Sequence, residues 1–343
     1  MTRYLSSVLA VMLFACGGGE QKPPETPPPS LEPTSSPAPK SSGSTPTSGP
    51  VAPTNSDDVK KGIAALKAGD LPGAKAAFDA AIAKNPKQAD AYHYRGVVED
   101  QGGQKADAEK DYRKALEIQP DLEESAVNLA AIDIEGGKYD EAIALMKKAI
   151  AKNPKSAALH VNLAMALSGK NDVDGANKEF EEAMKLEPNN ALTAVSYAQH
   201  LARSNKPKEA AAKLETAARL AASDPGVLAS VAIEYKSMKD FKSCISVLDK
   251  AIGQKDVAEL RVYRGTCKLG LHDLPGATAE FKDAVAKEPN NPVAHYSLGN
   301  ALGDAGKLQD AIGEWEQAIK LAPDTQMAKA AEKKIDVAKK KKK

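Results

Sequence analysis

Alanine recurs along this chain at an almost constant interval. The interval is 34 residues in every case but one, where it is 33. The recurring positions are Ala81, Ala115, Ala149, Ala183, Ala217, Ala251, Ala284 and Ala318. A fixed period of roughly 20–50 residues is typical of proteins that stack one small structural unit many times, whereas a single globular core needs no such period. The sequence therefore predicts about eight stacked units that offer an extended surface rather than one enclosed pocket.

Three further columns keep the same register. Seven residues before each recurring alanine lies a small residue: Ala74, Ala108, Ala142, Ala176, Ala210, Cys244, Ala277 and Ala311. Three residues before it lies a bulky one: Phe78, Tyr112, Met146, Phe180, Leu214, Leu248, Phe281 and Trp315. A second small column contains Gly62, Gly96, Ala130, Ala164, Ala198, Ala232, Gly265 and Gly299. Small residues let two helices approach closely while a bulky side chain fills the space beside them, so these columns predict pairs of antiparallel helices.

The ends of the units are also marked. A proline closes most of them and cannot continue a helix, so it indicates the turn into the next unit. These prolines are Pro86, Pro120, Pro154, Pro188, Pro289 and Pro323. The segment 139–150 has apolar residues at helical spacing with charged residues opposite, and no run of alternating β-branched residues occurs. These features together predict an all-α fold.

This pattern resembles the tetratricopeptide repeat family, in which a small residue stands at the eighth position of a 34-residue unit and alanines at the twentieth and twenty-seventh. The resemblance covers about residues 55–325. It implies a right-handed superhelical solenoid of about eight helix-turn-helix repeats, starting near residues 55, 89, 123, 157, 191, 225, 258 and 292. Residues 326–343 are expected to form a capping helix with a lysine tail, and Met327, Ile335 and Val337 are expected on the inner side of that helix.

The N-terminus carries a separate signal. Residues 1–15 contain a single cation, Arg3, and an apolar run too short to span a bilayer, which indicates a secretory signal peptide. The sequence Leu-Phe-Ala-Cys that ends at Cys16 resembles the lipobox of bacterial lipoproteins, and this resemblance implies lipidation of Cys16 after cleavage. In such lipoproteins a residue other than aspartate after the cysteine usually directs export to the outer membrane, so the resemblance and Gly17 together imply that location. The alternative is an ordinary secreted protein in which this cysteine occurs by chance.

Residues 16–54 have a different composition from the rest of the chain. Eleven of the 22 prolines fall here among Ser, Thr and Gly. Such a segment cannot bury enough apolar surface to order itself and favours extended conformations. The sequence predicts a disordered linker between the lipidated cysteine and the repeats, either as a passive stalk or with a docking motif of its own.

The resemblance also implies a binding surface, because the first helix of each tetratricopeptide repeat lines a concave face on which extended peptides often lie. The sixth position is Lys60 in the first unit. In each of the seven later units this position holds an uncharged residue that can form hydrogen bonds. They are Tyr94, Asn128, Asn162, Ser196, Ser230, Tyr263 and Ser297. We call these seven residues the ladder. An asparagine amide can both donate to and accept from a peptide group, so the ladder is a candidate peptide-binding surface. The alternative is that these are polar residues merely tolerated at the surface.

Two cysteines remain beyond Cys16. Cys244 takes a place in the first small column, and Cys267 lies in the first helix of the next unit. They lie twelve residues before and eleven residues after Asp256, near which the turn falls, so antiparallel helices would bring them to about the same level. A disulfide would be compatible with an oxidising periplasm, and the sequence leaves open whether the two thiols bond or stay free.

Nothing in the chain indicates catalysis or a cofactor. The five histidines fall in different units without metal-ligand spacing, and no nucleophile, phosphate-binding or dinucleotide motif occurs. His160 and His295 take equivalent positions, which indicates repeat geometry. A net charge of +1 gives no general attraction to nucleic acid. The final lysines, 339–343, form either a frayed tail or a contact for anionic envelope polymers.

The sequence therefore predicts a non-enzymatic protein-protein interaction scaffold without cofactors. It would be lipid-anchored in the bacterial cell envelope, in the outer membrane facing the periplasm, and would bind partner proteins or extended peptides during assembly of an envelope complex. The alternative is a regulator of a cell-wall (peptidoglycan) enzyme. The identity of the partner and the oligomeric state do not follow from the sequence.

Overall fold

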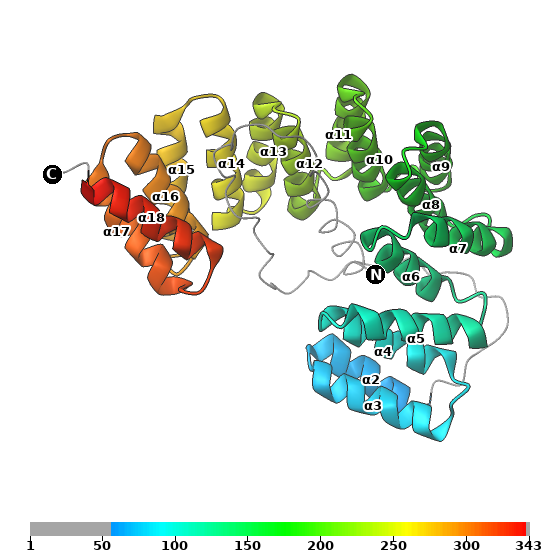
Figure 1. Ribbon diagram of the computed structural model, residues 1–343. Coiled ribbons are helices and arrows are strands. Elements are labelled where there is room, and N and C mark those ends of the chain that lie inside the picture. The colour runs from blue at the N-terminus through cyan, green and yellow to red at the C-terminus, as the bar shows by residue number, and fades with distance from the viewer. Residues whose placement is uncertain (1–55, 341–343) are drawn as a thin grey trace. The chain divides into compact units, whose positions relative to one another are not determined.

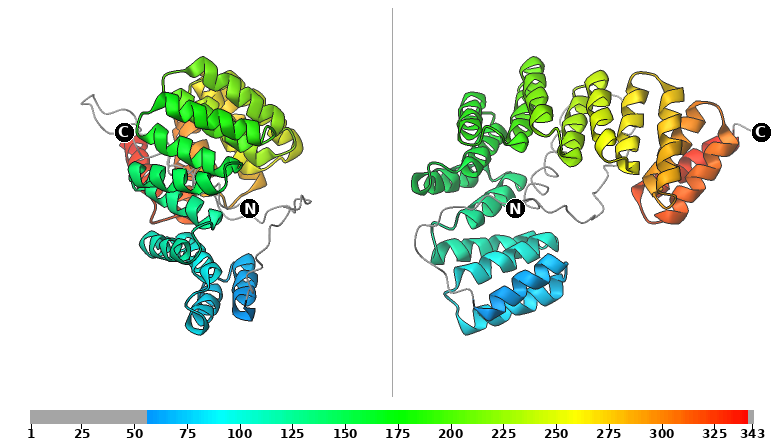
Figure 2. Two further views of the ribbon diagram at one scale, coloured as in Figure 1. Left: turned by 90° about the vertical axis from the view of Figure 1, so that its right-hand side faces the viewer. Right: turned by 180° about the vertical axis from the view of Figure 1, so that it is seen from behind.

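The computed structural model describes residues 56–340 and contains 17 helices and no strands within that range (Figure 1). The helices form eight consecutive pairs, and a last helix follows them (Figure 2). The all-α solenoid of helix-turn-helix repeats predicted from the sequence is confirmed. Cys16 and the linker lie outside the described residues.

The repeats divide into two compact units, and the sequence did not predict this division. Unit 1 pairs α2 (Asp57–Ala68) with α3 (Leu71–Lys84), α4 (Ala89–Gln101) with α5 (Lys105–Ile118), α6 (Glu123–Glu135) with α7 (Tyr139–Lys152), and α8 (Ala157–Gly169) with α9 (Val173–Leu186). Unit 2 pairs α10 (Ala191–Arg203) with α11 (Pro207–Leu220), α12 (Pro225–Ser237) with α13 (Phe241–Gln254), α14 (Ala258–Gly270) with α15 (Leu274–Lys287), and α16 (Pro292–Asp304) with α17 (Leu308–Leu321), and ends with α18 (Gln326–Lys340).

One left-handed residue turns the chain between the two helices of every repeat. In four repeats this residue is a glycine, and in the other four it is Asn, Lys or His with φ near +60°. The eight residues are Gly69, Gly103, Gly137, Asn171, Asn205, Lys239, His272 and Gly306. Glycine and asparagine adopt this conformation most readily, which explains why Gly-Gly and Ser-Asn pairs separate the helices in the sequence.

The residue columns identified in the sequence meet inside each helix pair. The bulky column is buried throughout, from Phe78 at 0% exposure to Trp315 at 4%. Its side chains face the second small column: a Cβ atom placed on Gly265 would lie 2.5 Å from Phe281 Cε1, and one on Gly299 would lie 2.6 Å from Trp315 Cδ1. In the four repeats with a glycine in this column, the close approach of the two helices therefore depends on the absence of a side chain at that position.

Helix α18 covers the last repeat of unit 2 with a narrow apolar face. Met327, Ala331 and Ile335 are buried in the same cluster as Trp315. The expectation for Val337 is wrong, because this side chain is 54% exposed. Residues two apart are separated by about 200° around a helix, so Val337 cannot share the inner face with Ile335. Within residues 56–340, no helix is both long and apolar enough to cross a membrane.

Candidate functional site

The ladder residues lie on the first helix of their repeats. Unit 1 carries Tyr94 on α4, Asn128 on α6 and Asn162 on α8, and unit 2 carries Ser196, Ser230, Tyr263 and Ser297 on α10, α12, α14 and α16. Asn162 and Ser196 are each only 6% exposed, and the other five are half-buried. These side chains are therefore partly withdrawn from water rather than fully solvated.

The two asparagines of unit 1 keep unused hydrogen-bonding atoms. Asn162 Nδ2 donates to the carbonyl oxygen of Ala158 at 2.9 Å, while its buried Oδ1 has no partner among the described residues. The buried Nδ2 of Asn128 also has no partner within residues 56–340. A buried polar group without a partner costs about 1–3 kcal/mol, so α6 and α8 hold one unsatisfied donor and one unsatisfied acceptor.

In unit 2, two ladder hydroxyls form hydrogen bonds within their own helices. Ser230 Oγ donates to the carbonyl oxygen of Gly226 at 3.2 Å, and the hydroxyl of Tyr263 donates to Glu259 Oε1 at 3.3 Å. Burial and the neighbouring Glu259 raise the pKa of Tyr263. Two of the four ladder hydroxyls of unit 2 thus already have partners on their own helices, whereas the two amides of unit 1 keep atoms without a partner among the described residues.

A group of polar residues beside Tyr94 was not predicted from the sequence. His93 Nδ1 lies 2.9 Å from Ser125 Oγ, and this buried contact joins α4 to α6. Burial lowers the pKa of His93 to about 4. Burial, and to a smaller extent the charge of Glu124 on α6, raises the pKa of Asp90 on α4. The signal was present in the sequence, because Asp90 and Glu124 each stand four residues before a ladder residue and so share its helix face.

Unit 2 has a comparable polar contact between neighbouring first helices. Gln199 Nε2 on α10 donates to Glu234 Oε1 on α12 at 2.8 Å. Burial raises the pKa of Glu234, although the hydrogen bond from Gln199 acts in the opposite direction. This carboxyl group already has a neutral donor, so it differs from the pair in unit 1.

Two family models of tetratricopeptide repeats match the sequence, one over residues 59–123 and 264–326 and the other over 101–160 and 133–190. The chain belongs to the tetratricopeptide repeat family. Proteins of this family generally mediate protein–protein interactions and are generally not enzymes.

Solved structures agree with this assignment at the level of the fold. Yeast Tom70 superposes with a TM-score of 0.63 at 18% identity, over 85% of this chain and 65% of the Tom70 chain. This chain thus spans about two-thirds of the length of Tom70. A tetratricopeptide repeat protein from Parabacteroides merdae superposes with a TM-score of 0.52 at 18% identity, over 72% of this chain and 98% of that one. No curated protein sequence is significantly similar to this chain.

The equivalent histidines of two repeats make equivalent contacts. His160 Nδ1 lies 2.6 Å from Glu179 Oε2 and its Nε2 lies 3.2 Å from the carbonyl oxygen of Pro154. His295 has the same arrangement, with Glu314 at 2.6 Å and the carbonyl oxygen of Pro289 at 2.9 Å. Each ring therefore ties its helix pair to the preceding turn. Across the described residues, no three His, Cys, Asp or Glu side chains are grouped as a metal site.

Cys244 and Cys267 form a disulfide in the structure. Their Cα atoms are 6.4 Å apart, and both side chains are buried. The bond links α13 to α14, the second helix of one repeat and the first helix of the next. Both residues also occupy buried packing positions, so the pair has a structural role in unit 2 rather than a place on the ladder.

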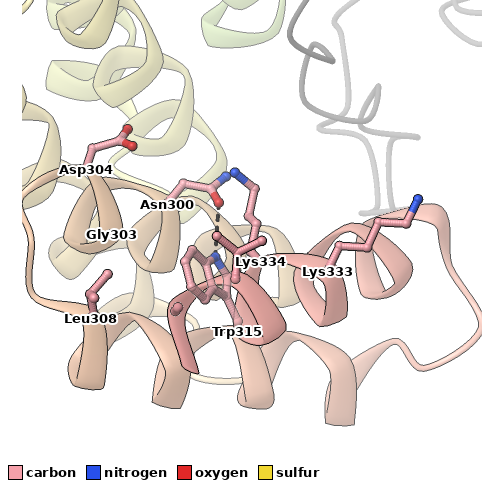
Figure 3. Close-up of a pocket in the computed structure, with 9 residues that line it drawn as sticks. Asn300, Gly303, Asp304, Leu308, Trp315, Lys333 and Lys334 are labelled. Atoms are coloured by element: carbon pink, nitrogen blue, oxygen red, sulfur yellow. Dashed lines mark hydrogen bonds between the residues drawn. The ribbon is translucent and has the colours of Figure 1, made fainter. Parts of the chain in front are cut away.

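A cavity of about 270 Å³ lies beside Trp315 in the last repeat (Figure 3). The indole Nε1 donates to Asn300 Oδ1 at 3.0 Å, and Lys334 Nζ lies 6.0 Å from the centre of the ring. Figure 3 shows Lys333 pointing away from this pair. The indole N–H is already used, and no side chain that lines the cavity holds a buried polar atom without a partner. The residues that line this cavity therefore do not indicate which ligand it would bind.

Proposed function

We propose that this chain is a scaffold of the bacterial cell envelope that binds an extended segment of a partner protein along the ladder of unit 1. The pair of unused amide atoms on Asn128 and Asn162 carries this proposal. One amide offers a donor and the other an acceptor, from equivalent positions of two adjacent repeats. Helices α6 and α8 are in contact, so both amides can reach one bound strand.

A peptide backbone matches these two atoms. Its carbonyl oxygen accepts from Asn128 Nδ2, and an N–H group donates to Asn162 Oδ1, so both unsatisfied groups gain partners on binding. Val127, one residue before Asn128, is half-buried and provides an adjacent apolar contact of the kind that peptide side chains need, whereas Val161 belongs to the buried core. Asn162 is only 6% exposed, so its hydrogen bond to a ligand would be protected from competing water.

The N-terminal sequence supports the envelope part of the proposal. Lipidation of Cys16 would anchor the chain to the outer membrane, and the proline-rich linker would hold the repeats in the periplasm. This location fits a protein that recruits components of an envelope complex, without cofactor or catalytic chemistry of its own.

Photo-crosslinking in living cells tests the binding surface. A benzoylphenylalanine in place of Asn128 is expected to capture a partner, whereas the same residue in place of Lys148, which is exposed on α7, is the matched control. Components of an envelope assembly machine among the captured proteins would support a scaffold, and a peptidoglycan synthase would favour the regulator instead. Equal capture from both positions would contradict the ladder as the binding surface.

The anchor needs a separate experiment. Cells fed an alkyne-labelled fatty acid are expected to label the wild-type chain and to leave the Cys16→Ser variant unlabelled, with the variant lost from the membrane fraction. A wild-type chain without label would contradict the lipoprotein assignment while leaving the peptide-binding proposal intact.

A further inference from the structure

We propose that the segment bound by unit 1 is cationic, and that Asp90, Tyr94 and Glu124 form a subsite for one of its lysine or arginine side chains. This inference rests on the proposed function, because Asn128 and Asn162 hold the peptide backbone that delivers the side chain. It adds the chemistry of the partner, which the repeat fold alone does not specify.

A hydrogen bond between two helices brings the subsite together. The contact between His93 and Ser125 joins α4 and α6 at a fixed level. Asp90 lies one helical turn before His93, and Glu124 is the residue immediately before Ser125. Asp90 and Glu124 therefore lie near the same level of α4 and α6, the two helices that this contact joins, and Tyr94 follows Asp90 by one turn on the same face of α4.

The ring of Tyr94 is held in place by other aromatic side chains. It stacks on Phe78 with 5.7 Å between ring centres and meets the ring of His93 edge-on at 5.0 Å. The phenolic hydroxyl has no hydrogen-bond partner within the described part of the chain. A fixed aromatic ring and a free phenolic oxygen both attract a cation, and the ring adds about 0.5–2 kcal/mol when the cation loses water.

Neither carboxyl group of the subsite has a cation of its own. Asp90 and Glu124 form no ion pair with any residue in 56–340, although other carboxylates of unit 1, such as Asp111 and Glu109, are paired with arginine or lysine. Burial and then Glu124 raise the pKa of Asp90, and burial followed by the two carboxylates raises the pKa of Tyr94. Two carboxylates that interact and have no counterion would be stabilised by a positive charge placed beside them, so the subsite favours a cationic side chain.

The ladder places two amide atoms without partners on α6 and α8, next to this position. Asn128 follows Glu124 by one turn of α6, and Asn162 occupies the equivalent place on α8. The unused acceptor of Asn162 belongs to a side chain that is more than nine-tenths buried. A peptide that satisfies these amides would extend toward the carboxyl pair, so its charged side chain and its backbone would be recognised by successive repeats.

Selection from a random peptide library displayed on phage tests this inference on the full chain. Peptides enriched by the wild-type protein are expected to share a lysine or arginine at one position, and the Asp90→Asn/Glu124→Gln variant is expected to lose that preference. An enriched peptide, made synthetically, should bind this variant at least about tenfold more weakly, as should a peptide with norleucine in place of the cation. The matched control is Asp107→Asn/Glu117→Gln, which changes two exposed carboxylates of α5.

The outcomes separate this inference from the proposed function. Enriched peptides without a common cation, or equal affinity for the Asp90→Asn/Glu124→Gln variant, would overturn the cationic subsite even if Asn128→Ala/Asn162→Ala abolished binding. Peptides that bind the Asn128→Ala/Asn162→Ala variant as tightly as the wild type would contradict the proposed function. An absence of any enriched peptide would contradict both. Circular dichroism of each variant checks that the repeats remain folded.

Discussion

The small residue at the eighth position of each repeat is either glycine or alanine, and the choice follows the size of the side chain that faces it. The four glycines in this column are the ones that face Phe78, Tyr112, Phe281 and Trp315, whereas the alanines face Met146, Phe180, Leu214 and Leu248. With one exception, Phe180, the missing methyl group makes room for an aromatic ring. Packing inside a repeat is therefore a matched choice of two residues.

We predict that Gly265→Ala destabilises unit 2 by about 1–3 kcal/mol, because the new Cβ would lie 2.5 Å from the ring of Phe281 and the interior is already closely packed. Gly313→Ala is the matched control: this glycine is exposed on α17 with no atom near its Cβ position, so alanine should stabilise its helix by up to about 1 kcal/mol. Urea unfolding compares the two. Phe281→Leu added to Gly265→Ala should recover part of the loss, and independent effects of the two changes would contradict the pairing.

His93 gives unit 1 a dependence on pH. Burial lowers its pKa from the ordinary 6.5 to about 4, so between these values the unfolded chain binds more protons than the folded chain. The contribution of His93 is complete above about pH 6.5 and is lost as the pH falls toward 4, by up to about 3 kcal/mol. His93→Gln keeps a partner for Ser125 and removes the titration. Urea midpoints at pH 7 and pH 5 should therefore differ less in this variant, and equal differences in both proteins would contradict the assignment.

The sequence revealed the packing residues and missed the polar ones for the same physical reason. Every repeat must solve the same packing problem, so Phe78 and its equivalents recur at a fixed spacing. The contact of His93 with Ser125 is made by one pair of helices, and a contact made once leaves no periodic signal in the sequence. The ladder was visible because its position repeats, but which of its members lack partners depends on side-chain geometry.

At the scale of helices, two arginines each link the helix that carries them to the helices before and after it. Arg95 on α4 donates from Nε and Nη2 to the carboxylate of Asp111 on α5, at 2.6 and 2.7 Å, and from Nη1 to Asp79 on α3 at 2.7 Å. Arg264 on α14 also links its two neighbouring helices, donating once from Nη1 to Asp249 on α13 at 2.6 Å and once from Nη2 to Glu280 on α15 at 2.8 Å. Both arginines stand at the seventh position of their repeats, so they join one repeat to the next.

We predict that Arg95→Met destabilises unit 1 by about 3 kcal/mol, because it leaves the buried carboxylate of Asp111 without its main partner. Arg95→Met/Asp111→Leu removes both charges and should recover most of the loss. Hydrogen exchange along α3, α4 and α5 locates the effect. A double variant as unstable as Arg95→Met alone would contradict this explanation.

The disulfide between α13 and α14 is expected to stabilise unit 2. It closes a loop with a sequence separation of 23 residues, for which restriction of the unfolded chain amounts to about 3 kcal/mol. Protein denatured without reductant should contain no thiol from Cys244 or Cys267 that reacts with maleimide, and reduction should lower the urea midpoint of unit 2. Two reactive thiols in protein purified without reductant would contradict the bond.

Across the molecule, the repeats share one fold but not one surface. The alanine spacing predicted the solenoid because stacking imposes the same constraint on every copy. The division between residues 188 and 189 could not be predicted from the sequence, because the 34-residue spacing continues across it unchanged. The two units also differ in their ladders: the amides of Asn128 and Asn162 in unit 1 have unused atoms, whereas Ser230 and Tyr263 in unit 2 bond to their own helices.

The most direct test of the ladder in unit 1 is a calorimetric titration of the full chain with the partner segment captured at Asn128. We predict that Asn128→Ala/Asn162→Ala weakens binding at least about tenfold, while Ser230→Ala, whose hydroxyl already bonds to Gly226, leaves the affinity unchanged. Equal affinities for the wild type and the double asparagine variant would contradict the central claim that these two amides hold the partner.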